Sequence, residues 1–137
     1  MFSHKTKDQL DTREDHLREL VSGLRGMVAR ITEPRLDERR EQLLANLANF
    51  AYDPVNYDFF EALGVPALFL EIMVLTLNTT GPVVRPGHRD TLLEFAVGGI
   101  CNLSLDPRFQ AQLSSGQGVT LVIRCLSSEN TETGCRP

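Results

Sequence analysis

Apolar residues recur at helical spacing from the first third of the chain onward. Leu17, Leu20, Val21, Leu24, Val28 and Ile31 fall at the i, i+3, i+4, i+7 spacing of one helix face. Thr12 suits the N-cap position, and Pro34 disfavours helical backbone in the residue before it. The pattern predicts a helix from Thr12 to about Ile31, preceded by a flexible N-terminus over residues 1–11.

Three further helical segments are expected in quick succession. The first spans Leu36 to Tyr52, with an apolar face. Asp53-Pro54 then combines a preferred N-cap with a residue that fits the first helical turn, so a short helix should run from Pro54 to Leu63. Gly64 ends it, and a further helix should span Val65 to Leu75. The expected buried positions are Leu43, Leu44, Leu47, Phe50, Ala51, Leu68, Phe69, Ile72 and Met73.

The same order of residues then recurs. Residues 49–54 align with residues 102–107 at an offset of 53, which pairs Asp53-Pro54 with Asp106-Pro107. Gly64-Val65 aligns with Gly118-Val119 at an offset of 54. Three helices per unit and a repeat of this kind predict an all-α fold of the α-solenoid type. The alternative is two unrelated short helices that both follow an Asp-Pro pair.

The offset exceeds the roughly 40 to 47 residues of common helical repeats, so we expect an insertion. Thr76 to Asp90 is the candidate loop, since Gly-Pro and Pro-Gly pairs interrupt its helical periodicity. We therefore predict one helical domain over residues 12–128, an inserted loop over residues 76–90 and a flexible tail over residues 129–137.

Composition and charge favour a globular protein that does not hold nucleic acid by itself. The chain has 137 residues and a net charge of -4. Residues 1–40 carry 9 basic and 8 acidic side chains, whereas residues 41–137 carry 5 basic and 10 acidic ones. No basic stripe is visible, and Arg35, Arg39 and Arg40 alternate with acidic residues as on a solvated helix face.

The cysteines and the absence of targeting signals favour the cytosol or nucleus. Three cysteines without a C-x-x-C pair are expected to be reduced thiols. No secretory signal or continuous membrane-spanning segment is visible in the sequence.

Several strings carry a resemblance to a known family. They are Leu44-Ala45-Asn46-Leu47-Ala48-Asn49-Phe50-Ala51-Tyr52-Asp53-Pro54, Leu68-Phe69-Leu70, residues 92–103 and Cys125-Leu126-Ser127-Ser128. They resemble the armadillo-repeat family over most of residues 36–130. The resemblance implies a right-handed superhelix of short helices, with about two clear repeats plus an N-terminal helix. Relative to the family, the loop at residues 76–90 is longer, and the chain ends soon after Ser128.

The resemblance also implies a function. It indicates a non-enzymatic scaffold of the minor spliceosome, which acts in the splicing of minor-class introns with RNA-binding motif protein 48 and other minor-spliceosome components. It implies a nuclear location, with the cytoplasm as an addition. The runner-up function is a general peptide-binding armadillo adaptor, and an enzyme is the outsider.

Within such a superhelix, the resemblance implies a groove in which asparagine side chains bind the backbone of an extended partner. Asn49 and Asn102 look like those positions, although capping of their own helix ends is an equal alternative. Four residues earlier, where nuclear-import armadillo proteins carry Trp, this chain has Ala45 and Gly98, so basic localisation peptides are not expected ligands. Asp53, Asp106, Gly64 and Gly118 are the expected structural caps.

Catalysis is not expected. His4, His16 and His88 are far apart and fit no metal-ligand spacing, and no phosphate-binding glycine loop or nucleophile motif is visible. Cys101 lacks an evident neighbouring base. We therefore predict no catalytic residue, no metal site and no cofactor.

Overall fold

Helices make up nearly all of the part of the chain that the structure describes, which is residues 4–30, 33–78, 87–114 and 118–126 of a computed structural model. In these ranges the α-helices are α1 (His4–Val28), α2 (Asp37–Phe50), α3 (Tyr57–Leu63), α4 (Val65–Asn78), α5 (His88–Leu103), α6 (Pro107–Ser114) and α7 (Gly118–Leu126). Two short 3-10 helices, η1 (Pro34–Leu36) and η2 (Pro54–Asn56), lead into α2 and α3. The predicted all-α fold is confirmed.

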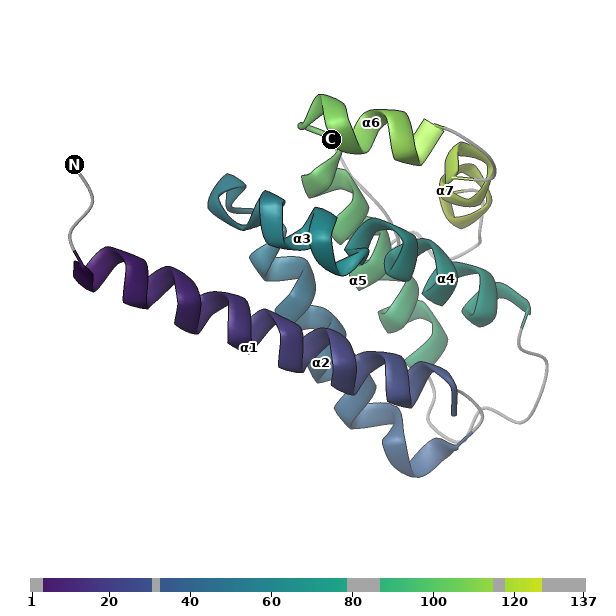
Figure 1. The fold of residues 1–137 in the computed structure, drawn as a ribbon. Helices are drawn as coiled ribbons and strands as arrows, with labels where there is room; N and C mark the ends of the chain where they lie inside the picture. The colour runs from purple at the N-terminus through teal and green to yellow at the C-terminus, as the bar shows by residue number, and fades with distance from the viewer. Residues whose placement is uncertain (1–3, 31–32, 79–86, 115–117, 127–137) are drawn as a thin grey trace.

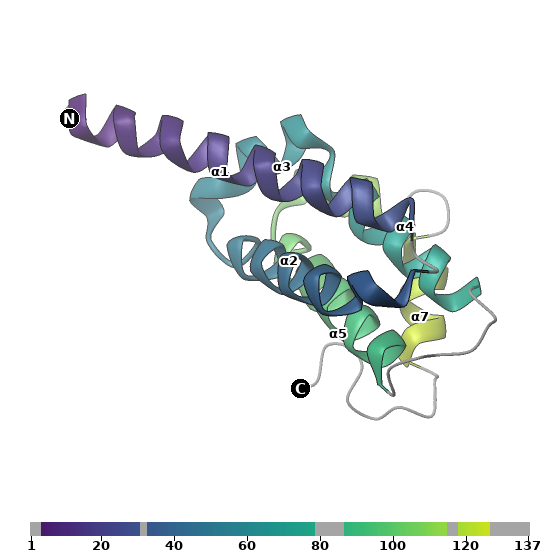
Figure 2. The same ribbon diagram turned by 90° about the horizontal axis from the view of Figure 1, so that it is seen from below.

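The helices stack in successive layers (Figure 1). The long α1 lies along one side, α2 packs behind it, and α5 lies beside α2, as the view from below shows (Figure 2). Helix α5 packs extensively against both α2 and α4, while α6 and α7 lie next to each other beyond α4 and α5. This stacking of short helical units is an α-solenoid arrangement.

The apolar faces predicted from the sequence form one continuous core. The α1 face contributes Leu17, Leu20, Val21, Leu24 and Val28, all buried, and the cluster extends through α2, α4 and α5 to Phe109 and Leu121. Phe69 is fully buried against α5, where a Cβ on Gly99 would lie 2.6 Å from the Phe69 ring. The absence of a side chain at Gly99 therefore allows α4 and α5 to approach closely.

The first helix begins earlier than predicted. It starts at His4 rather than Thr12, so residues 4–11, which we assigned to a flexible N-terminus, are helical. Neither proline nor glycine interrupts the chain between His4 and Ser22, so a polar segment extends the helix without needing an apolar face. Thr12 lies within α1 and is not its N-cap.

The predicted loop at residues 76–90 is shorter at both ends. Helix α4 continues to Asn78, where the buried Thr76 hydroxyl donates to the Ile72 carbonyl at 2.6 Å. Helix α5 starts at His88, after Gly87 in left-handed backbone with a φ of 83°. The middle of the predicted loop, residues 79–86, and the predicted tail, residues 129–137, lie outside the described residues.

The repeat keeps one register throughout, which corrects the predicted shift to an offset of 54. At an offset of 53, Gly118 corresponds to Val65 and Leu121 to Leu68, and all four residues are buried. Gly64, by contrast, adopts left-handed backbone and ends α3. Gly118 is therefore the first residue of α7, as Val65 is the first residue of α4, and it is not the counterpart of the Gly64 cap.

None of the described helices is by itself both long and apolar enough to cross a membrane. The segments Pro54–Leu63 and Val65–Asn78 meet that test only as a pair, and they are bent by 70° relative to each other.

Candidate protein-interaction face

Two equivalent helices present the predicted partner-binding residues. Ala45 and Asn49 lie one turn apart on α2, and Gly98 and Asn102 lie one turn apart at the corresponding positions of α5. Asn49 is exposed, and the other three residues are half-buried. A Cβ on Gly98 would meet nothing within 4 Å, so the surface of α5 is open at that point. We call these four residues the α2–α5 face.

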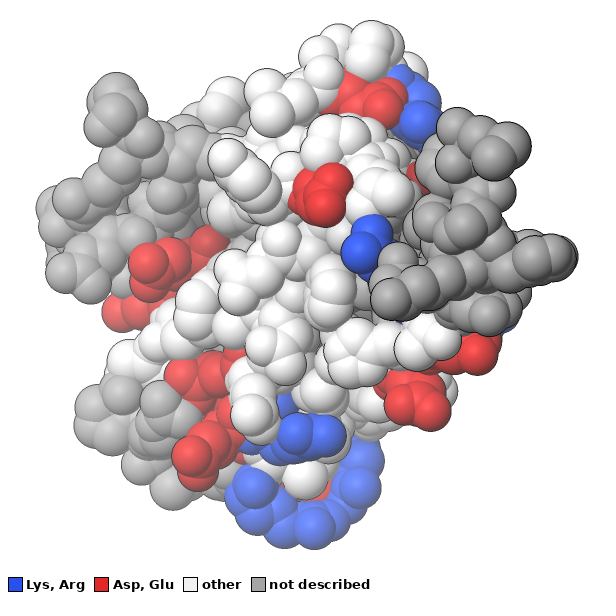
Figure 3. All heavy atoms as spheres, turned by 90° about the vertical axis from the view of Figure 1, so that its left-hand side faces the viewer, with Lys and Arg blue, Asp and Glu red and all other residues white. Residues whose placement is uncertain are grey.

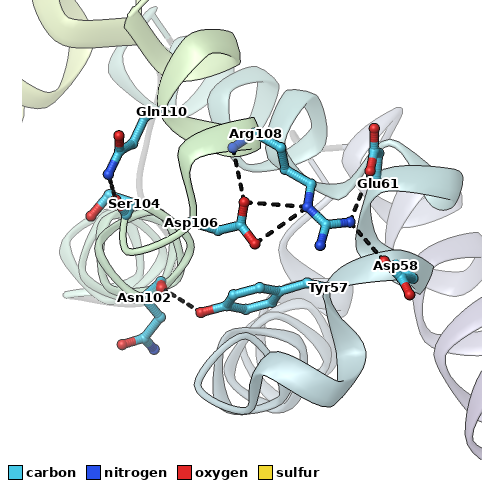
Figure 4. Close-up of polar contacts among 8 residues, drawn as sticks. All are labelled: Tyr57, Asp58, Glu61, Asn102, Ser104, Asp106, Arg108 and Gln110. Carbon is cyan, nitrogen blue, oxygen red and sulfur yellow. Dashed lines mark hydrogen bonds and ion pairs between the residues drawn. The ribbon is translucent and has the colours of Figure 1, made fainter.

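Asn102 connects the two helices. Its side-chain amide donates to the Ala48 carbonyl at 3.4 Å, next to Asn49 near the end of α2. Its own backbone carbonyl accepts a hydrogen bond of 3.0 Å from the Tyr57 hydroxyl, as Figure 4 shows. Asn102 thus bonds a neighbouring repeat rather than capping its own helix end.

Burial raises the pKa of Tyr57 above its ordinary value, and the negative charges of Asp106 and Asp53 raise it further. The Tyr57 hydroxyl consequently keeps its proton, and its role as donor to Asn102, to higher pH than a free tyrosine.

A buried polar cluster joins the N-terminal ends of α2 and α5. Arg40 is 0% exposed, and its guanidinium donates to Asp37 at 2.7 Å, to the carbonyl of Met27 in the last turn of α1, and to the carbonyls of Arg30 and Glu33 beyond that helix. His88, the first residue of α5, lies 2.9 Å from Glu41 and 3.2 Å from Asp37. Asp37, Arg40, Glu41 and His88 form what we call the Arg40 cluster.

The Arg40 cluster corrects the prediction of a solvated helix face. Arg35 and Arg39 are exposed as predicted, but Arg40 is buried, where it pairs with Asp37 and donates to the carbonyls of Met27 and Arg30. With bonds at both ends, α2 and α5 are held in register, and the α2–α5 face is positioned by rigid helices.

Arg108 links α6 to α3, and sequence reasoning missed it. Its guanidinium lies 2.7 Å from Asp58, 3.0 Å from Glu61 and 3.2 Å from Asp106 (Figure 4). The carboxylates, Asp58 first and then Glu61 and Asp106, raise the pKa of Arg108 above its ordinary value. The only sequence signal was position, since Arg108 follows Asp106 by two residues as Val55 follows Asp53.

The two Asp-Pro turns are built alike. Asp53 is the N-cap of η2 and accepts a hydrogen bond from the Val55 amide at 3.1 Å. Asp106 accepts one from the Arg108 amide at 2.8 Å, just before α6. Each aspartate thereby satisfies an N-H group that its helix leaves without an intrahelical acceptor.

The two glycines differ. Gly64 ends α3 with a φ of 69°, a conformation that favours glycine. Gly118 lacks that conformation, but a Cβ there would clash with the Leu113 carbonyl, so it permits the close approach of α6 and α7.

Two exposed apolar side chains extend the α2–α5 face. Tyr52 and Leu105 occupy equivalent positions three residues after Asn49 and Asn102, and each is 76% exposed. Tyrosine is a frequent anchor in protein interfaces, and an exposed leucine adds apolar contact area. The sequence aligned these residues but did not reveal their exposure.

Uncharged side chains cover the middle of the molecular face seen in Figure 3, the left-hand side of Figure 1. Acidic and basic side chains also interrupt the upper middle of this face, and basic side chains gather at its lower edge, but no continuous basic stripe crosses it. Such a surface suits contact with protein better than contact with a nucleic-acid backbone.

The histidines and Cys101 lie apart from one another in chemically different surroundings. His16 packs edge-on against Phe50 at 5.5 Å, His88 belongs to the Arg40 cluster, and the His4 side chain lies outside the described part. Within the described ranges, no group of three or more His, Cys, Asp or Glu side chains is arranged to hold a metal ion. Cys101 takes part in a disulfide bond, so the prediction of reduced thiols is wrong for this residue.

These features define the class of protein: a stack of helical repeats with the architecture of a protein-interaction scaffold. Comparison of sequences supports the same class. The chain is 38% identical over 78 residues to armadillo repeat-containing protein 7 of Mus musculus, which confirms the resemblance to an armadillo-repeat protein. The match covers 57% of this chain and 33% of the mouse protein, so the chain matches about a third of the length of that relative. No family model matches the chain.

Proposed function

We propose that this chain is a non-enzymatic scaffold of the minor spliceosome and acts in the splicing of minor-class introns. In this proposal it works in the nucleus with RNA-binding motif protein 48. The observation that carries the proposal is the 38% identity to mouse armadillo repeat-containing protein 7. The similar region spans 78 residues, which is 57% of this chain.

The charge distribution supports a division of labour between the two proteins. The chain has a net charge of -4, and its residues from 41 onward carry 10 acidic and 5 basic side chains. Such a chain gains little from phosphate contacts, which dominate affinity for RNA. An RNA-binding partner would hold the RNA, and this chain would supply a protein-binding surface.

The α2–α5 face and its two apolar neighbours are the surface that we assign to this partner. Asn49 is exposed, Gly98 leaves open space, and Tyr52 and Leu105 project from the adjoining turns. An asparagine amide both donates and accepts hydrogen bonds, so it suits the backbone of a bound segment. Tyr52 would be the main anchor of the bound segment, and Leu105 would add apolar contact area.

Co-purification from nuclear extract tests the proposal. The tagged full chain should capture RNA-binding motif protein 48 together with the small nuclear RNAs of the minor spliceosome. The double variant Tyr52→Asp/Leu105→Asp should reduce this capture at least tenfold, because it places charges in the interface. Glu19→Ala, on the exposed side of α1, is the matched control and should capture as the wild type does.

A second candidate function is a general armadillo peptide-binding adaptor. The observation that favours it is the open surface beside Gly98, which would admit an extended backbone of many sequences. In the same experiment an adaptor would capture varied proteins without minor-spliceosomal RNA. That outcome would overturn the splicing proposal while leaving the scaffold class intact.

A further inference from the structure

A buried histidine attaches the first turn of α5 to α2. His88 is 7% exposed, and its ring lies beside two carboxylates of α2 that are also buried, those of Asp37 and Glu41. The ring Nδ1 lies 2.9 Å from Glu41 Oε2, and the ring Nε2 lies 3.2 Å from Asp37 Oδ1. Each ring nitrogen of His88 therefore meets a carboxylate oxygen.

Both contacts are favourable only when both ring nitrogens carry a proton. Neutral imidazole has one N-H donor and one acceptor nitrogen, whereas imidazolium has two donors. A single proton on Nδ1 would leave the Nε2 lone pair against Asp37, and a single proton on Nε2 would leave the Nδ1 lone pair against Glu41. Within the described residues the buried Nε2 makes no aligned hydrogen bond, so its attraction to Asp37 depends on the positive charge of the ring.

The other charged groups around α5 are compatible with a charged ring. Arg40 donates to the same Asp37 oxygen at 2.7 Å, so two cations share that carboxylate and Glu41 supplies a second negative charge. On α5 itself Asp90 is exposed. The other helices that pack against α5 carry one charged residue each, which are Glu71 on α4, Arg108 on α6 and Arg124 on α7. The first and last of these are exposed, and Arg108 is bonded to carboxylates around α3.

We propose that His88 is a proton-dependent latch between α2 and α5. With both ring nitrogens protonated, it holds the first turn of α5 against the N-terminal end of α2. Loss of one proton to water leaves a lone pair facing a carboxylate, which weakens the attachment and loosens the two helices that carry the α2–α5 face. The inference goes beyond the proposed function because it concerns control of the fold by pH, and it holds whichever partner the chain binds.

The direction of the pH dependence follows from this loss of a proton. Stability falls with rising pH wherever the folded state binds more protons than the unfolded state. The stability that the latch contributes is therefore present while His88 is doubly protonated and is lost as the pH rises. Histidine ordinarily changes charge between about pH 5 and 8, and carboxyl groups near about pH 4, so measurements at about pH 6 and about pH 8.5 compare the two forms of the ring.

Urea denaturation of the full chain and of His88→Gln at these two pH values tests the latch. Glutamine can donate to one carboxylate but cannot carry the positive charge of the ring. The factor by which His88→Gln lowers the folding equilibrium constant should be at least fivefold larger at about pH 6 than at about pH 8.5. His16→Gln removes an exposed histidine on α1 and is the control, for which that factor should agree within twofold at both pH values. A factor for His88→Gln that does not change with pH would overturn the proposal.

Nuclear magnetic resonance of the wild-type full chain gives a second readout that needs no variant. Long-range proton–nitrogen spectra at about pH 6 should show that both ring nitrogens of His88 are protonated, because burial without carboxylate partners would favour the neutral ring. A His88 ring with a single protonated nitrogen under these conditions would contradict the latch, whether or not His88→Gln folds.

Discussion

Two helical units, α3 with α4 and α6 with α7, begin alike and end differently. Each starts with an Asp-Pro turn in which the aspartate accepts a backbone hydrogen bond, at Asp53 in one unit and Asp106 in the other. In the first unit α4 is covered by α5, whereas Val119 and Ile123 on α7 of the second unit are exposed. Local sequence sets how a unit starts, but coverage by the next helix decides how stable it is.

The largest expected loss of stability comes from the Arg40 cluster, at the N-terminal ends of α2 and α5. Arg40→Ala should destabilise the chain by about 3 to 5 kcal/mol, because it leaves the buried Asp37 carboxylate without its arginine partner and removes the donors to the Met27 and Arg30 carbonyls. Arg39→Ala, on the exposed side of the same helix, should change stability by less than about 0.5 kcal/mol. Urea denaturation of both variants checks this, and equal midpoints would show that the Arg40 cluster contributes no special stability.

Substitutions at two adjacent glycines of α5 test the close contact between α4 and α5. Gly99→Ala should destabilise by roughly 1 to 3 kcal/mol because its Cβ would clash with the Phe69 ring. Gly98→Ala, which meets open space in the same helix, should instead stabilise by about 0.5 to 1 kcal/mol. Thermal unfolding measures both, and changes of the same sign would contradict the packing described for α5.

Because the two units start with the same Asp-Pro turn, removing either aspartate should lower the free energy of unfolding by a similar amount. Asp53→Ala should cost about 0.5 to 2 kcal/mol through loss of the N-cap acceptor. Asp106→Ala should cost at least as much, because Asp106 also contacts the Arg108 guanidinium. An unchanged denaturation midpoint in either variant would mean that water or another group replaces the cap.

The exposed side of α7 should give the smallest change in stability. Ile123→Ala removes an exposed side chain and should change stability by no more than about 0.5 kcal/mol in the free chain. Phe69→Ala, in the covered unit, is the reference and should cost about 3 to 5 kcal/mol. A large loss for Ile123→Ala would show that this side of α7 is covered in solution.

The helices, the Asp-Pro turns and the pairing of the two units could be predicted because they depend on local spacing. The Arg40 cluster could not, since the alternation of Arg40 with Asp37 and Glu41 is the same whether a helix faces water or a neighbour. The register at Gly118 was misread because a glycine before an apolar helix fits both a cap and a close contact.

The α2–α5 face was only partly predictable, because its details depend on tertiary packing and not on local spacing. The resemblance to the armadillo-repeat family indicated Asn49 and Asn102, but the bond from Asn102 to the Ala48 carbonyl depends on how α2 and α5 pack. The exposure of Tyr52 and Leu105 and the links made by Arg108 are likewise consequences of tertiary packing.

Native-state hydrogen exchange of the free chain tests most directly whether the first unit is closed and the second is open. We predict that amides of α4 and α5 exchange only with an opening free energy close to that of global unfolding. Amides of α7 should exchange through a separate, smaller opening, with protection at least tenfold lower. Equal protection of α4 and α7 would contradict the account, because it would mean that both units are closed to the same degree.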